Sequence, residues 1–209
     1  MSTVNSSVHA TSPATAARPL PSNVSGTRSP AWWGMIFFIT TEATLFAALV
    51  SSYFYLASGA PIWPPDGIKP PDLFGPILGT VLLLSSSAPI IGGEQAIKRG
   101  DRRGLLLGWG IAWLLAVIFI GLQIHEYTKE TFSIRTNQYA SLFFSITGLH
   151  VLHVMGALLM NLFVLFHVLG GRVTKNRHLA VETVGIYWHF VGVVWIVVFT
   201  SLYVIPHFL

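Results

Sequence analysis

The chain has 209 residues, of which 53% are hydrophobic and 10% are charged, whereas about 25% of the residues of an ordinary soluble domain are charged. The mean hydropathy is +0.64, and the sequence contains no cysteine. These values exclude a disordered chain, a soluble globular domain, a disulfide framework and a thiolate metal site. The formal net charge of +4 is spread over short basic clusters, which favours orientation in a bilayer over nucleic-acid binding. The composition therefore predicts a polytopic membrane protein.

Taken in chain order, residues 1–29 are rich in Ser, Thr, Pro and Ala and are predicted to form a disordered tail. Residues 30–209 contain five apolar runs, each long enough to cross a bilayer, for which a helix needs about 20 residues. None of the runs alternates apolar and polar residues as a barrel strand would. We therefore expect an all-α bundle of five transmembrane helices, over about 32–56, 73–97, 104–126, 138–169 and 180–206.

Two local patterns predict how these helices bend and pack. Pro89 follows three consecutive serines, Ser85 to Ser87, within the second run, and this combination predicts a bend there. The small-residue spacings Gly75-x-x-x-Gly79 and Gly104-x-x-x-Gly108 permit close contact between helices.

The basic residues of the tail and loops predict the orientation of the bundle. Nine Lys and Arg residues fall on the side of the N-terminal tail and three on the opposite side. Because cytoplasmic segments carry the excess of Lys and Arg, we expect a cytoplasmic N-terminus and a periplasmic C-terminus.

Glu42 is the one charged residue in the first run. It lies ten residues beyond Trp32, about 15 Å along a helix and thus close to the middle of the membrane. An ionised carboxylate is costly at that depth, so Glu42 should be protonated, paired or next to water. Two interpretations follow: a proton-linked or substrate-linked site, or a neutral acid held in the bundle by hydrogen bonds, with Thr40, Thr41 or Thr44 as candidates.

Three histidines lie in the last two runs. His150 and His153 share one helix face, and His189 lies a third of the way into the final helix. Neutral imidazole is a common haem and metal ligand. However, the spans place His153 and His189 on the order of 10 Å apart in depth, and no second carboxylate or cysteine completes a metal site. We expect core histidines that hydrogen-bond across helices, and no bound metal.

Three glutamates mark helix ends. Glu94 has Lys98 at i+4, which predicts an ion pair on the helix surface. Glu126 closes the third helix, where we expect interfacial anchoring. Glu182 opens the fifth helix, where a carboxylate suits the positive end of the helix dipole.

Six motifs in one order together resemble a known family. From about Trp32 to Pro206, the chain resembles subunit III of the haem-copper respiratory oxidases, of the cytochrome c oxidase type, in the five-helix short form found in many bacteria. The motifs are Trp33–Met35 with Thr41–Phe46, Trp63–Ile68, Gly100–Arg103, Gln123–Tyr127, Thr147–Val154 and Tyr187–Trp195.

The resemblance implies a multi-pass subunit of a bacterial inner membrane that is not itself catalytic. It implies that haem and copper belong to partner subunits I and II, and that this chain contacts subunit I directly, binds phospholipid, supports proton uptake and binds no nucleic acid. Glu42 matches the intramembrane glutamate of the family. Other matching polar positions, implied to serve packing, are Glu126, His150, His153, Glu182 and His189. The family usually has an aspartate where this chain has Gly192.

Two other functions stay open at this point. A stand-alone proton-coupled transporter would use Glu42 directly, although the absence of an internal repeat and of a second mid-membrane charge weighs against it. A subunit III of a quinol oxidase, or the related subunit of a nitric oxide reductase complex, would share the fold. The electron donor is decided in other subunits, so this sequence does not distinguish these complexes.

Overall fold

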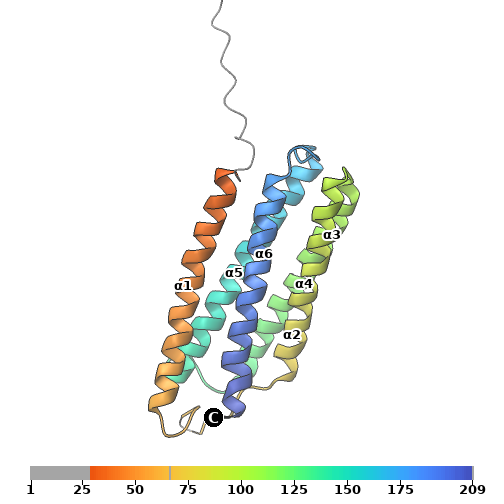
Figure 1. The fold of residues 1–209 in the computed structure, drawn as a ribbon. Coiled ribbons are helices and arrows are strands. Elements are labelled where there is room, and N and C mark those ends of the chain that lie inside the picture. Colours follow the sequence, from red (N-terminus) through yellow and green to blue (C-terminus); the bar gives the residue numbers. More distant parts are fainter. Residues whose placement is uncertain (1–28, 66, 209) are drawn as a thin grey trace, which may run out of the picture.

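The computed structural model describes residues 29–65 and 67–208, and all regular elements within them are helices (Figure 1). The predicted tail at 1–29 lies outside the described residues except for Ser29, which caps the first helix by accepting a hydrogen bond from the Trp32 amide.

Six α-helices make up the bundle. In chain order they are α1 (Pro30–Gly59), α2 (Phe74–Ser85), α3 (Ser87–Lys98), α4 (Arg102–Lys129), α5 (Gln138–Leu169) and α6 (Leu179–Phe199), and α6 continues into the short segments η1 (Thr200–Val204) and η2 (Ile205–His207). Helices α2 and α3 together form one span, so the described residues contain five segments long and apolar enough to cross a membrane. The prediction of an all-α bundle with five spanning helices is confirmed.

The second span is interrupted at Ser86, which lies between α2 and α3. Pro89 has no amide hydrogen to bond the carbonyl of Ser85, so the helical hydrogen-bond ladder is broken one turn before the proline. The Ser86 hydroxyl donates to the Leu83 carbonyl at 2.6 Å and accepts from the Trp188 indole at 2.9 Å. The run expected as one helix is therefore two, joined at the predicted serine–proline segment and tied there to α6.

Helix α6 is the centre of the bundle, and α1 stands at its side (Figure 1). Helix α6 packs against α1, α2, α3 and α5, whereas α1 packs mainly against α5 and α6. In the most apolar 18-residue stretch of the span Leu179–His207, which contains α6, half of the residues are buried, against 6% in the corresponding stretch of α1. Most of the surface of α1 is therefore left for lipid or for another protein.

Candidate functional site

Within residues 29–65 and 67–208, the more buried of the two ion pairs between helices joins α1 to α5. The Glu42 carboxylate oxygen Oε2 lies 2.7 Å from His153 Nε2, and the two side chains are only 20% and 12% exposed. The threonines expected as alternative partners of Glu42 do not serve that role. The hydroxyls of Thr40, Thr41 and Thr44 each donate to a carbonyl of their own helix.

The second ring nitrogen of His153 fixes the proton count of this pair. His153 Nδ1 lies 2.7 Å from the Leu149 carbonyl oxygen, which can only accept, so Nδ1 carries a hydrogen. One further proton then lies between Nε2 and Oε2. Whether it sits on the imidazole or on the carboxyl group, the Glu42–His153 pair is neutral as a whole, and a neutral pair costs far less than a single charge inside a membrane-spanning helix.

His150 lies one turn before His153 and differs from it in its surroundings. It is fully buried, and its ring packs against Trp195 at a centroid distance of 4.8 Å and against Phe46 and Phe119. Neither ring nitrogen has a hydrogen-bond partner within the described part of the chain. The expected hydrogen bond across helices is therefore present for His153 and wrong for His150, because aromatic rings that offer no nitrogen or oxygen acceptor enclose its ring.

His189 is half-buried on α6 and is not part of the Glu42–His153 pair. Over residues 29–65 and 67–208, no three His, Asp or Glu side chains come close enough together to hold a metal ion. The His and Glu side chains of this site can therefore carry protons and form hydrogen bonds.

A second ionic cluster lies where α3 ends and α6 begins. The Glu182 carboxylate oxygen Oε1 is 3.3 Å from Lys98 Nζ and 3.3 Å from His178 Nε2. Lys98 forms its ion pair with Glu182, which α6 brings to the same lysine. It also interacts electrostatically with Glu94, so the predicted favourable i+4 interaction is present, without an ion-pair contact. Glu182 does lie in the first turn of its helix, as expected. The Glu94 carboxylate instead occupies the space that a Cβ atom at Gly185 would fill.

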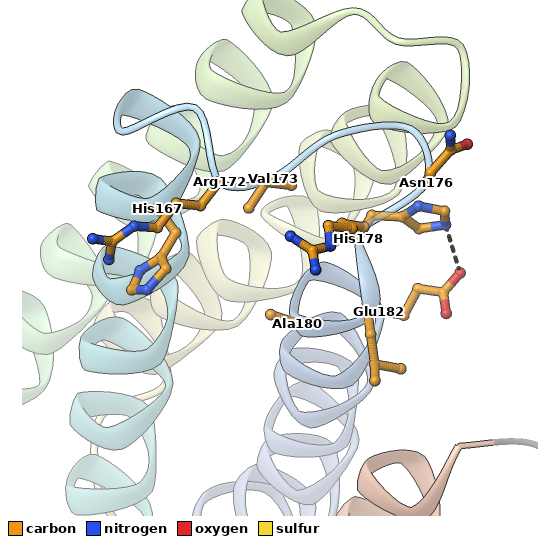
Figure 2. A pocket seen from close by; sticks show the side chains of 9 residues that line it. His167, Arg172, Val173, Asn176, His178, Ala180 and Glu182 are labelled. Atoms are coloured by element: carbon orange, nitrogen blue, oxygen red, sulfur yellow. Dashed lines mark ion pairs between the residues drawn. The ribbon is translucent and has the colours of Figure 1, made fainter. Parts of the chain in front are cut away.

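A basic pocket lies beside this cluster, between the end of α5 and the start of α6. Figure 2 shows His167 and Arg172 on one side of it and the ion pair of His178 with Glu182 on the other. Arg177 also lines it. We call this the α5–α6 pocket. The sequence identifies these arginines only as part of the basic excess on one side of the bundle, because their convergence depends on the turn between the two helices.

The opposite end of the bundle carries the other helix-end carboxylate. Glu126 is buried, and its Oε1 accepts a hydrogen bond from Lys129 Nζ at 2.7 Å. Its carboxylate packs against Gly75 of α2 and fills the space that a Cβ atom at that position would need. In the following loop, burial raises the pKa of Glu130, and the neighbouring carboxylates of Glu126 and Asp72 raise it further.

This raised pKa predicts a pH-dependent effect of replacing Glu130 by Gln. A carboxyl group whose pKa is higher in the folded state binds more protons folded than unfolded, so its favourable contribution is complete at low pH and lost as the pH rises through the folded pKa. At pH 7.5 the Gln variant should therefore unfold at a higher temperature than the unmodified chain. Below about pH 4 the two should coincide. Thermal unfolding at both pH values measures the difference, and an equal shift at both would contradict the assignment.

Most of the chain is similar to known oxidase subunits. The family model for cytochrome c oxidase subunit III matches residues 24–206. The cytochrome c oxidase subunit 3 of Thermostichus vulcanus is 36% identical over 176 residues, covering 84% of this chain and 87% of the relative. The chain belongs to the cytochrome c oxidase subunit III family. The Synechocystis subunit 3 is 36% identical over 174 residues, 83% of this chain and 75% of its own, and that of Neurospora crassa is 38% identical over 176 residues, 81% and 65%.

Membership in this family makes the chain a subunit III of a haem-copper oxidase, a multi-pass membrane protein that belongs to a complex with other subunits. The resemblance deduced from the six motifs is thereby confirmed.

Gly192 is the position where the resemblance predicts an aspartate. It lies on the buried face of α6, where a Cβ atom would meet Leu84 Cδ2 at 3.8 Å, an ordinary contact. One turn to either side, the Trp188 and Trp195 indoles donate to Ser86 and Thr80 at 2.9 and 2.8 Å. Two indole–hydroxyl hydrogen bonds thus hold this face of α6 to the second span without an aspartate.

Proposed function

We propose that this chain is an accessory subunit III that carries no redox centre itself and supports proton uptake by the catalytic subunit. Haem and copper reside in partner subunits, the chain contacts subunit I directly, and subunit II belongs to the same complex. In this proposal the protein crosses a bacterial cell membrane with its N-terminus in the cytoplasm and its C-terminus in the periplasm.

The Glu42–His153 pair carries this proposal. The pair holds one exchangeable proton between two partly exposed side chains. Glu42 lies on α1, a helix whose buried residues are only Phe46, Val50 and Tyr53. A partner subunit that packs on α1 would therefore lie close to an intramembrane proton. The remaining polar positions, Glu126, His150, Glu182 and His189, are proposed to serve packing and helix ends.

The α5–α6 pocket supports the phospholipid part of the proposal. Arg172 and Arg177 line it together with His167 and His178, and guanidinium groups bind phosphate by paired hydrogen bonds. It lies at the end of the bundle that the count of basic residues assigns to the cytoplasm, at the level expected for lipid headgroups.

Two measurements on the purified complex test this function. Solubilised in a mild detergent, the chain should co-purify with a haem-containing polypeptide, whereas the chain alone should show no Soret absorbance. Replacing Glu42 by Gln should leave the initial rate of oxygen consumption within about twofold, because Gln can still donate to His153. The same complex should lose activity faster over successive turnovers. Stoichiometric haem on the isolated chain, or immediate loss of electron transfer in the Gln variant, contradicts the proposal.

A further inference from the structure

Tyr187 of α6 is a buried polar side chain beside the Glu42–His153 pair. On the α1 side, its ring lies 5.7 Å from the ring of Phe38, measured between centroids, and Phe38 is one helical turn before Glu42. On the α5 side, its hydroxyl lies 3.7 Å from the position that a Cβ atom of Gly156 would take, and Gly156 follows His153 by three residues. Tyr187 therefore contacts the same faces of α1 and α5 that carry the pair.

The Tyr187 hydroxyl needs a hydrogen-bond acceptor. Within the described part of the chain, it forms no hydrogen bond with another side chain or with the backbone. A buried hydroxyl without a hydrogen bond is costly, and the core of a bilayer supplies no bulk water to compensate it. The charged group with which Tyr187 interacts electrostatically is Glu42. Glu42 uses Oε2 for His153, which leaves Oε1 to accept.

The space beside this hydroxyl suits a water molecule. A Cβ atom at Gly156 would have the Tyr187 hydroxyl as its one neighbour within 4 Å outside its own helix backbone, so the surrounding space is open. A water that bridges two polar groups is nearly as favourable as a direct hydrogen bond. A buried water needs two to four polar partners, and the hydroxyl and the carboxylate supply two.

We propose that Tyr187 is a positioning residue of the Glu42–His153 pair: its hydroxyl donates to one bound water, which in turn donates to Glu42 Oε1. Hydrogen bonds to a carboxylate favour its charged form, so this contact draws the shared proton towards His153. The inference deepens the proposed function, on which it rests, because it names the side chain of a third helix that decides where the proton of the pair resides.

A packing role for Tyr187 makes a different prediction. Its ring also lies 6.1 Å from the ring of Phe190, so the aromatic part alone has neighbours on two helices. Phenylalanine supplies the same ring without the hydroxyl. Tyr187→Phe therefore keeps the packing and removes the donor.

Infrared spectroscopy of the purified complex tests the position of the proton. The carbonyl band of a protonated carboxyl group is distinct from the bands of a carboxylate, and subtracting the spectrum of a Glu42→Gln variant isolates the contribution of Glu42 in each background. We expect Tyr187→Phe to raise the ratio of protonated to ionised Glu42 about fivefold, which corresponds to the loss of one hydrogen bond. An unchanged Glu42 band overturns the proposal.

Tyr203→Phe is the matched control for the loss of a buried hydroxyl. Tyr203 lies in the same span as Tyr187, but its hydroxyl accepts a hydrogen bond from Gln123 at 2.8 Å. The Glu42 band should therefore stay as it is in the unmodified complex. An equal rise in both phenylalanine variants would mean that the pair responds to a general loosening of the bundle, and the positioning role would be wrong.

Two glycine variants of α5 test the bridging water. Gly156→Ala places a methyl group in the open space beside the Tyr187 hydroxyl, and Gly148→Ala adds the same group where a Cβ atom meets no heavy atom within 4 Å. We expect Gly156→Ala to raise the protonated fraction of Glu42 as Tyr187→Phe does, and Gly148→Ala to leave it unchanged. Equal spectra for the two alanine variants overturn the bridge.

Failure of this inference is distinguishable from failure of the proposed function. The infrared measurement requires no turnover, whereas the proposed function is tested by the loss of activity of the Glu42→Gln complex over successive turnovers. If that loss is no faster than in the unmodified complex, the function fails, and a raised Glu42 band in Tyr187→Phe still supports the role of Tyr187. If the loss is faster but the band is unchanged, the function holds and Tyr187 is not part of the site.

Discussion

Replacing Glu42 by Ala is expected to increase the fraction of molecules in which α1 is undocked from the bundle. The increase should exceed that caused by any other single substitution in this helix. The change leaves His153 Nε2, which is 2.7 Å from the carboxylate in the intact pair, without a partner. Removing one member of a buried pair costs about 3 kcal/mol, at the lower end of the usual range because both side chains keep some exposure. Few other buried contacts compensate, since α1 buries only Phe46, Val50 and Tyr53.

The absence of cysteine makes this release measurable. A Val50→Cys reporter places a single thiol on the buried face of α1, and its rate of reaction with a membrane-permeant maleimide follows the fraction of undocked α1. About 3 kcal/mol corresponds to an acceleration of about 100-fold.

Two further variants separate the hydrogen bond from the charge. Glu42→Gln should accelerate labelling far less than Glu42→Ala, since its amide donates to a neutral His153 and a retained hydrogen bond is worth about 1 kcal/mol. Glu42→Leu combined with His153→Leu should restore slow labelling, because apolar residues of similar size often replace a buried pair without loss. Thr44→Ala, which removes a hydroxyl bonded only to its own helix, is the control. Fast labelling in the Leu–Leu variant would show that α1 depends on something other than this pair.

The spanning helices were predictable because hydropathy alone decides them. Unbroken apolar runs of membrane length leave no alternative to helices, and serines followed by Pro89 identify the break at Ser86. Helix pairing was not predictable at the same level. Lys98 has Glu94 one turn away on its own helix, yet it pairs with Glu182, because the approach of α6 to α3 depends on packing that no local pattern encodes.

The Glu42–His153 pair shows most directly what one sequence cannot supply. Counting residues places Glu42 about 15 Å from the start of the first run and His153 about 24 Å from the inner end of α5, which suggests a mismatch in depth. Helix α5 has 32 residues, about 48 Å, and so must tilt or extend beyond the hydrocarbon. Depth counted along such a helix is not depth in the membrane. The residues of the site were therefore identifiable, but their partnership was not.

Replacing Gly108 by Ala is the second change with a large expected effect, because it separates α3 from α4. A Cβ atom at Gly108 would overlap the Pro89 carbonyl oxygen and lie 3.3 Å from the Gly93 amide nitrogen. Both are backbone atoms, so no side-chain rotation relieves the overlap and the helices must move apart. Gly104, one turn earlier, faces the Ala96 methyl group in the same way, which explains the predicted small-residue motif.

We expect Gly108→Ala to lower the free energy of unfolding by about 2–3 kcal/mol. Thermal unfolding of the purified complex, followed by a signal from this subunit, measures the change. Gly110→Ala is the matched control two residues further along α4, where a Cβ atom meets no heavy atom within 4 Å. Because alanine favours helix, that variant should gain about 0.5–1 kcal/mol. The two substitutions add the same methyl group to the same helix, so their difference isolates the close approach of α3. Equal unfolding temperatures would mean that α3 and α4 do not meet at Gly108, and the glycine there would then have no packing role.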